Sequence, residues 1–429
     1  MNRRTSISTR TERLEDWFHT HIKIPRSVII AICILPVILT ALFYALRSTR
    51  SVMDWVAFYI SQPVRSFFGL LSSLYPFSIM EIVSTALVVF LIYYVVKSIR
   101  DTSRRREKWK LLGKRLLPIL IVACYIWCAF CWLWNSGYHS SGFAAKNGFS
   151  GDGVSVSDLT AVTRLFADKA SELSILAPRD EEGRYVSVRR DMFADSTHVY
   201  RNISGEFPSL GGRLYAPNPM IYSWLMTITG YSGVYFALTG EVMINTQTPG
   251  AFMPYSVAHE HAHQLGVFAE DEASFVGILA CVTSDNTTFE YAGYLSGLNY
   301  LLGALVTVDA DAVNEIIGGL TAEVNLDRYE NYMFWASRTT ANTGVDFLDR
   351  FLSSVMETTS DAVNTAYDGF LRSQNQELGI KSYGACVDHL VEYFAKIAAE
   401  AEAAAEAEAA DDAEAADDPE AAFYISAAA

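Results

Sequence analysis

The sequence predicts a mainly α protein with a small β-sheet: a zincin-like α+β domain that follows three transmembrane helices. Three apolar runs near the amino terminus are long enough to span a bilayer. Apolar residues recur at helical spacing through most of the remaining chain. Two short runs rich in β-branched and aromatic residues precede a His-Glu-x-x-His motif, as in the small sheet beside a zincin metal helix.

The apolar runs cover residues 28–46, 77–96 and 116–134. The first is too long for the core of a secretory signal and lacks a small-residue cleavage site, so we expect it to be retained. Lys and Arg are frequent before the first run and between the second and third, and sparse between the first and second. The positive-inside rule therefore predicts a cytoplasmic segment 1–27 and an extracytoplasmic domain 135–398.

The link between the first two runs carries apolar residues at helical spacing from Trp55 to Leu74. Such a stretch could lie in the membrane interface or pack beneath the later domain. A simple connector fits equally well.

The run His259-Glu260-His261-Ala262-His263 matches the zinc motif His-Glu-x-x-His. On a helix, His259 and His263 lie on one face and can bind one zinc ion, with Glu260 beside the open position of the metal. Pro254 suits the start of this helix and Gly266 suits its end. We expect His261 to face away from the metal. The alternative is a surface helix that carries these residues by chance.

A third zinc ligand is expected from the acids Glu270, Asp271 and Glu272, which open the next helix. They also have a purely structural explanation, because acids in a first turn complement the helix dipole. Ala269 stands where the metzincin signature requires a third His, which argues against that class. Glu272 precedes the small Ala273, as in several gluzincin-like peptidases, so Glu272 is preferred, Glu270 is second and Asp271 third.

The domain after the membrane region is expected to be mainly helical. A strand edge beside the metal helix could pair with an extended peptide. Helices are predicted at 155–173, 222–229, 291–306, 309–317, 345–358, 362–374 and 382–398, and strands at 233–238 and 241–245.

The formal net charge of −15 comes mostly from the acidic, Ala-rich tail 399–429, which we expect to be solvated and disordered, with a partly helical form as the alternative. Basic residues sit beside the membrane segments instead, so nothing indicates nucleic-acid binding. Cys281 and Cys386 are expected to stay unpaired.

Several segments resemble the bacterial family known as domain of unknown function 3810. They are residues 233–245, 254–266 and 270–281, Asn364, Tyr367, the run Lys381-Ser382-Tyr383-Gly384 and the run Pro76-Phe77-Ser78. The resemblance covers residues 25 to 396. It implies a membrane protein similar to zinc peptidases, mostly of Gram-positive or Bacteroidetes-type bacteria, with no established substrate.

The expected function is a membrane-anchored zinc metallopeptidase that cleaves extracytoplasmic peptides or envelope proteins. His259, His263 and Glu272 would hold Zn²⁺, and Glu260 would take a proton from water and deliver it to the leaving amine. Tyr383 is the candidate donor to the oxyanion. A catalytically silent zincin-fold receptor or sensor, and a structural membrane protein with an accidental motif, are the alternatives. The bilayer and a peptide or protein substrate are the expected partners.

Overall fold

The computed structural model describes residues 25–103, 106–150, 154–342, 345–374 and 383–417. These residues form two compact units. The first contains residues up to 48 together with 90–132, and the second contains residues 49–89 together with those from 133 onward.

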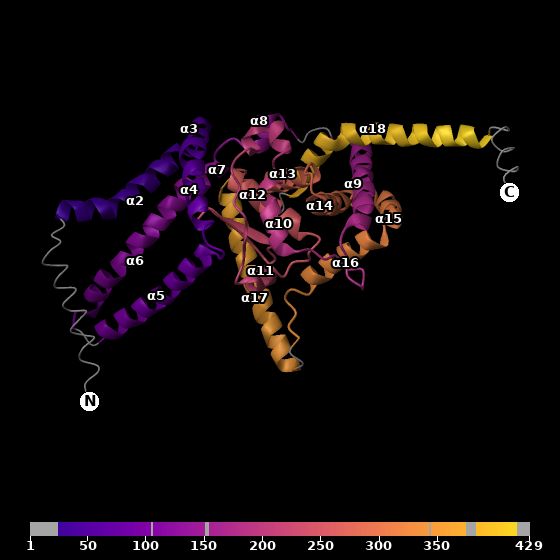
Figure 1. The fold of residues 1–429 in the computed structure, drawn as a ribbon. Coiled ribbons are helices and arrows are strands. Elements are labelled where there is room, and N and C mark those ends of the chain that lie inside the picture. Colours follow the sequence, from indigo (N-terminus) through magenta and orange to yellow (C-terminus); the bar gives the residue numbers. More distant parts are fainter. Residues whose placement is uncertain (1–24, 104–105, 151–153, 343–344, 375–382, 418–429) are drawn as a thin grey trace. The chain divides into compact units, whose positions relative to one another are not determined.

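The first unit consists of apolar helices: α2 (Arg26–Leu46), the later part of α5 (Ile79–Thr102) and α6 (Lys108–Phe130), seen in Figure 1. The hydroxyl of Tyr125 in α6 donates to the carbonyl of Ile32 in α2 at 2.8 Å. Helices at 27–46, 79–102 and 108–138 are long and apolar enough to cross a membrane. The third continues from α6 through a π-helical turn (Cys131–Asn135) and α7 (Ser136–Tyr138).

The link between the first two apolar helices belongs to the second unit. It runs as a nearly continuous helix through α3 (Arg50–Val56), a π-helical turn (Ala57–Ser61) and α4 (Gln62–Ser72). One side of it is buried, with Arg65 only 1% exposed. Of the possibilities that the sequence left open, the simple connector is therefore excluded.

A small sheet lies at the centre of the second unit. Its order is β1 (Asn218–Pro219), β3 (Glu241–Ile244), β2 (Gly233–Phe236), with β1 parallel and β2 antiparallel to β3. Gly240, with φ of 68°, allows the tight turn between β2 and β3. Among the described residues β2 pairs only with β3, so its other edge is free of strand pairing.

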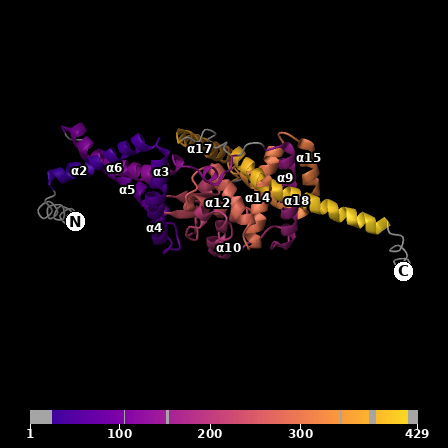
Figure 2. The same ribbon diagram turned by 90° about the horizontal axis from the view of Figure 1, so that it is seen from above.

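Helices stack on this sheet. Helix α12 (Met253–Leu265) packs on β2 and β3, and α13 (Glu270–Val282) packs on α12. Helix α14 (Thr287–Leu305) packs on α13 and on α9 (Val156–Leu176), as Figures 1 and 2 show. The core is thus built around the two helices that follow the sheet in sequence.

The other helices of the second unit surround this core. They are α8 (Phe143–Asn147), α10 (Arg189–Asp195), α11 (Ser223–Thr229), α15 (Ala310–Gly319), α16 (Ala322–Ala336), α17 (Asp346–Ser373) and α18 (Tyr383–Asp417), with 3-10 turns at Ser196–His198, Ile203–Gly205 and Pro208–Leu210.

The predicted fold class, mainly helical with a small sheet after three apolar helices, is confirmed. Three details differ. The two helices predicted at 345–358 and 362–374 form the single helix α17, because no Gly or Pro interrupts residues 359–361. Helix α16 escaped notice because its exposed side carries large apolar residues such as Tyr332 and Met333. Strand β1 is too short for any periodic signal.

The acidic tail was expected to be disordered, with a partly helical form left open. In the structure, helix α18 continues through residues 399–417. Ala and Glu are among the strongest helix formers, which explains why a low-complexity run of this composition extends a helix. Residues 418–429, and residues 1–24 of the predicted cytoplasmic segment, lie outside the described residues.

Candidate metal centre

Helix α12, which carries the His-Glu-x-x-His motif, has well-defined ends. Pro254 lies in its first turn, where a missing N–H breaks no hydrogen bond. Gly266 follows its last residue with φ of 99°, a left-handed conformation that suits glycine. Val257 and Ala262 are fully buried, so one side of the helix is fixed in the core.

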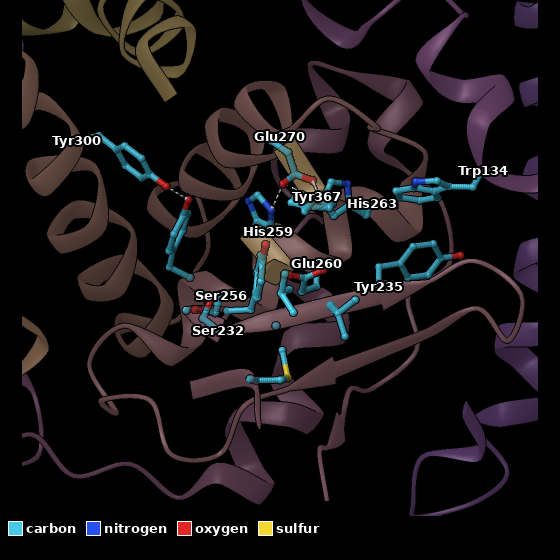
Figure 3. A pocket seen from close by; sticks show the side chains of 17 residues that line it. Trp134, Ser232, Tyr235, Ser256, His259, Glu260, His263, Glu270, Tyr300 and Tyr367 are labelled. Carbon is cyan, nitrogen blue, oxygen red and sulfur yellow. Dashed lines mark hydrogen bonds and ion pairs between the residues drawn. The ribbon is translucent and has the colours of Figure 1, made fainter. Parts of the chain in front are cut away.

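Three side chains converge at α12 (Figure 3). Oε2 of Glu270 lies 3.2 Å from Nε2 of His259 and 3.5 Å from Nε2 of His263. The potential ligand atoms of the three residues all lie within 4.8 Å of one another. The two imidazole rings are nearly perpendicular, at 89°. Two imidazole nitrogens and one carboxylate oxygen are a common donor set for catalytic zinc.

The acid in this cluster is Glu270, which corrects the sequence-based choice of Glu272. Both carboxylate oxygens of Glu272 accept hydrogen bonds from the N–H groups of Phe143 and Ala144, at 2.8 and 3.0 Å. Glu272 therefore caps the first turn of α8. Residues two apart on a helix point to nearly opposite sides, so α13 can direct only one of these two acids at the histidines. Asp271 is not part of the cluster.

Contacts behind the cluster orient each of its members. The hydroxyl of Tyr367 in α17 donates to Oε1 of Glu270 at 2.5 Å, which leaves Oε2 directed at both histidines. Nδ1 of His263 lies 2.7 Å from the carbonyl of Val267. Since a carbonyl only accepts, this Nδ1 carries a proton, and in the neutral ring Nε2 would be the nitrogen free to bind a metal. Such partners behind a ligand fix its tautomer and direction.

Burial and opposite charge set the protonation of the metal-free cluster. Burial alone would lower the pKa of His263, but the adjacent Glu270 carboxylate raises it to about 9. Burial likewise favours the neutral form of Glu270, yet His263 and His259 hold its pKa well below the usual range. The carboxylate is therefore ionised and attracts a positive charge, which a metal ion can supply in place of the proton.

We expect Tyr367→Phe to weaken zinc binding by about 10–100-fold, the usual effect of removing a group that orients a ligand. The variant loses only the hydroxyl that holds Glu270. Zinc affinity measured by competition with a chelator tests this. Tyr332→Phe, which removes a hydroxyl from an exposed position on α16, is the matched control. If both variants bound zinc with equal affinity, Tyr367 would have no role in orienting Glu270 for the metal.

Glu260 lies beside the cluster and is only 6% exposed. Burial raises its pKa, against the opposing effects of the two histidines and of a backbone hydrogen bond from Tyr235. Gly233 in β2 makes room for it, because a Cβ atom at that position would lie 2.7 Å from Cγ of Glu260. The sheet thus fixes the position of this carboxyl group.

A cavity of about 380 Å³ opens in front of the cluster. Six of its 17 lining residues are Trp or Tyr, and its walls include the edge strand β2. It is lined by Trp134, Met226, residues 230–235, Tyr255, Ser256, His259, Glu260, His263, Glu270, Tyr300, Val363 and Tyr367. A metal ion held by the cluster would therefore face a space large enough for part of a peptide.

Two further residues were singled out from the sequence. His261 points away from the cluster, as expected: its Nε2 lies 3.0 Å from Oγ of Ser196, and burial lowers its pKa to about 3. The side chain of Tyr383 lies outside the described residues. Among the described residues that line the cavity, the hydroxyl of Tyr367 donates to Glu270, and the hydroxyl of Tyr231 donates to Oδ1 of Asn364 at 3.1 Å.

A sequence model of the family described as "Protein of unknown function (DUF3810)" matches residues 57–391. No curated protein and no solved structure matches the chain.

Proposed function

The chain belongs to the DUF3810 family, and from its site we propose that it is a membrane-anchored zinc metallopeptidase that cleaves extracytoplasmic peptides or envelope proteins. The observation that carries this proposal is the convergence of His259, His263 and Glu270 beside the buried Glu260. A chance His-Glu-x-x-His sequence would have no reason to meet a carboxylate from another helix.

The donor set fits zinc. It offers two imidazole nitrogens and one carboxylate, all from a buried and preorganised cluster, and it faces an open cavity. When bound, zinc polarises the carbonyl of a substrate and lowers the pKa of water to about 7. The same ligand set in a closed site would indicate a structural metal instead.

Glu260 is the proposed general base and acid. It takes a proton from the attacking water and delivers it to the leaving amine. Because burial raises its pKa, the carboxyl group can hold that proton between the two steps. The close approach of Gly233 holds this carboxyl group in place for both steps.

Strand β2 is the proposed binding edge for the substrate. Its free edge lines the cavity through Gly233, Val234 and Tyr235, so an extended peptide can add to the sheet beside Glu260. Tyr231 is a second proposed donor to the oxyanion, beside Tyr383. Its hydroxyl donates to Oδ1 of Asn364 at 3.1 Å in the structure and would exchange that partner for the oxyanion. Burial and the Glu270 charge raise the pKa of Tyr231 to about 12, so its hydroxyl keeps the proton that it must donate.

The experiment that tests this function uses the purified full chain in detergent, loaded with zinc. A mixture of unrelated peptides is incubated with it, and new termini are read by mass spectrometry. We expect cleavage that stops on chelation and returns with added zinc. A protein that binds zinc stoichiometrically but cleaves nothing would favour the receptor or sensor.

The proposed orientation places the catalytic domain outside the cytoplasm. We expect a reporter that is active only outside the cytoplasm to work when fused after Asn135 and to fail when fused near Arg105. The reason is the dense run of Lys and Arg between the second and third apolar helices, which favours the cytoplasmic side. The opposite pattern would exclude envelope substrates.

A further inference from the structure

The link between the first two apolar helices, residues 51–78, has an unusual charge distribution. Arg47 and Arg50 lie just before this stretch, with Arg50 exposed at the first residue of α3. Within the stretch, Asp54 and Arg65 are the only charged residues, and both turn toward the domain. Asp54 accepts hydrogen bonds from the N–H and hydroxyl of Ser141, at 2.6 and 2.9 Å. The Arg65 guanidinium donates to the carbonyl of His263 at 3.0 Å and is buried. Beyond Arg50, the outward side of the link therefore carries no charge.

That outward side is apolar and exposed. Phe58 is 68% exposed and Leu74 is 69% exposed. The other exposed members of this surface, called the outer face below, are Trp55, Tyr59, Phe67, Leu71, Tyr75 and Phe77. Contiguous apolar surface of this kind marks a site of contact with a membrane or another protein.

The position of the link in the chain indicates that the outer face contacts the membrane. Only residues 47–49 separate α2 from α3, and only residues 73–78 separate α4 from α5. If α2 and α5 both cross the membrane, the link leaves and re-enters the same bilayer face. A helix from 50 to 72 is about 35 Å long and must then lie along that face. Trp, Tyr and Phe side chains without charges suit the headgroup region of a bilayer.

The inner side of the same link holds the metal helix. Besides the contact of Arg65 with the His263 carbonyl, Nε2 of Gln62 donates to the carbonyl of Gln264 at 2.9 Å. These are carbonyls of the last turn of α12, and that of His263 also accepts from the N–H of Gly266 at 3.1 Å. The link thus packs against the metal helix α12 with its inner side, while its opposite side carries the outer face.

Two further contacts tie the sheet to the start of a membrane helix. The carboxylate of Glu241 in β3 accepts from the N–H groups of Ile79 and Met80, at 2.8 and 2.9 Å. Glu81 in α5 accepts from the N–H groups of Ile221 and Tyr222 at the start of α11, both at 2.9 Å. These hydrogen bonds hold the sheet and the start of α11 next to the first residues of α5. If α5 crosses the membrane, this part of the domain lies close to the bilayer.

The third apolar helix reaches the cavity itself. At 31 residues it is about 46 Å long, whereas the hydrocarbon core of a bilayer is about 30 Å thick. Its end therefore projects from the membrane. Trp134 near that end lines the cavity, and its ring lies 5.6 Å from the ring of His263. A side chain of the third apolar helix thus lies directly beside one of the proposed metal ligands.

We propose that the outer face lies in the headgroup region, and that the site acts on polypeptides anchored in the same membrane, close to their anchor. This inference rests on the proposed function and narrows its substrate class. In the reaction, the hydroxyl of water bonds to the acyl carbon, the C–N bond breaks, and the amine takes the remaining proton. One product stays in the membrane with the anchor.

The membrane contact is tested without any activity. In the full chain in lipid nanodiscs, the photoreactive residue benzoylphenylalanine replaces Leu74, Phe58 or, as a control, Ile175, which is 70% exposed on α9. We expect lipid adducts by mass spectrometry at Leu74 and Phe58 and none at Ile175. Crosslinked dimers from Leu74 and Phe58 would identify a second copy as the occupant. Dimers, or adduct yields no higher than the control, would overturn the proposal.

The substrate class is tested in vesicles of phosphatidylethanolamine and phosphatidylglycerol that contain the full chain. One cleavable peptide is compared in free form and linked to an acyl chain by a spacer of about 4 or about 30 residues; the short spacer reaches at most about 14 Å. We expect kcat/KM for the short-spacer peptide to exceed that of the free peptide at least tenfold and to match the long-spacer peptide.

The outcomes separate this inference from the proposed function. Cleavage of the free and long-spacer peptides, with the short-spacer peptide resistant, would place the site away from the bilayer and overturn the inference alone. Equal cleavage of free and anchored peptides would also overturn it. If no peptide is cleaved, the proposed function and this substrate class both fall, while the adducts still decide the position of the outer face.

Discussion

Glu270→Gln is expected to lose zinc, whereas Glu272→Gln is expected to retain it. In the structure Glu270 supplies the oxygen that faces both histidines, and no other acid belongs to this cluster among the described residues. Removal of a group behind a ligand already costs about 10–100-fold in affinity, so loss of a ligand charge should cost more than about 100-fold. Zinc content after dialysis, measured by mass spectrometry, tests both variants.

Glu272→Gln is a matched control, because it makes the same chemical change two residues away. It weakens the cap on α8, since an amide is a poorer acceptor for the N–H groups of Phe143 and Ala144. We expect a lower melting temperature, from a loss of about 1.5–3 kcal/mol, with zinc still bound. Zinc lost by Glu272→Gln and retained by Glu270→Gln would restore the assignment made from the sequence.

Glu260→Gln is expected to keep zinc and lose hydrolysis. The amide has the size of the carboxyl group and leaves His259, His263 and Glu270 untouched, but it cannot accept the proton of water. A general base of this kind contributes about 10²–10⁴-fold to the rate. The test is kcat for any peptide that the wild-type protein cleaves, with zinc content and melting temperature measured on the same sample.

Two results would contradict this role. Unchanged kcat in Glu260→Gln would assign the proton transfer to another group. Loss of zinc together with activity would make Glu260 part of the metal site.

The sequence was sufficient for the elements that carry the His-Glu-x-x-His motif and insufficient for their mutual placement. The periodicity around His259 and His263 predicts helix α12, and Gly266 predicts its end. Which acid of α13 meets the histidines depends on how the two helices cross, and Gly277 sets that crossing: a Cβ there would lie 3.1 Å from the backbone of His259. No local pattern around Glu270 or Glu272 contains this information.

The remaining parts of the site come from distant segments. Tyr367 is 97 positions from Glu270 in sequence, and Trp134 belongs to the third apolar helix. Tyr367 was among the residues that carry the family resemblance, but its neighbours indicate only an amphipathic helix. The packed face of the link 51–78 was equally hidden, because the aromatic residues that dominate its pattern lie on the opposite, exposed side.

The location of the metal is tested most directly by X-ray absorption at the zinc edge on the zinc-loaded full chain, wild type and Glu270→Gln. We expect two imidazole nitrogens at about 2.0–2.1 Å and oxygen at about 2.0–2.2 Å in the wild type, and no bound zinc in the variant. A spectrum without imidazole ligands, or one that Glu270→Gln leaves unchanged, would contradict the metal centre on which the proposed peptidase depends.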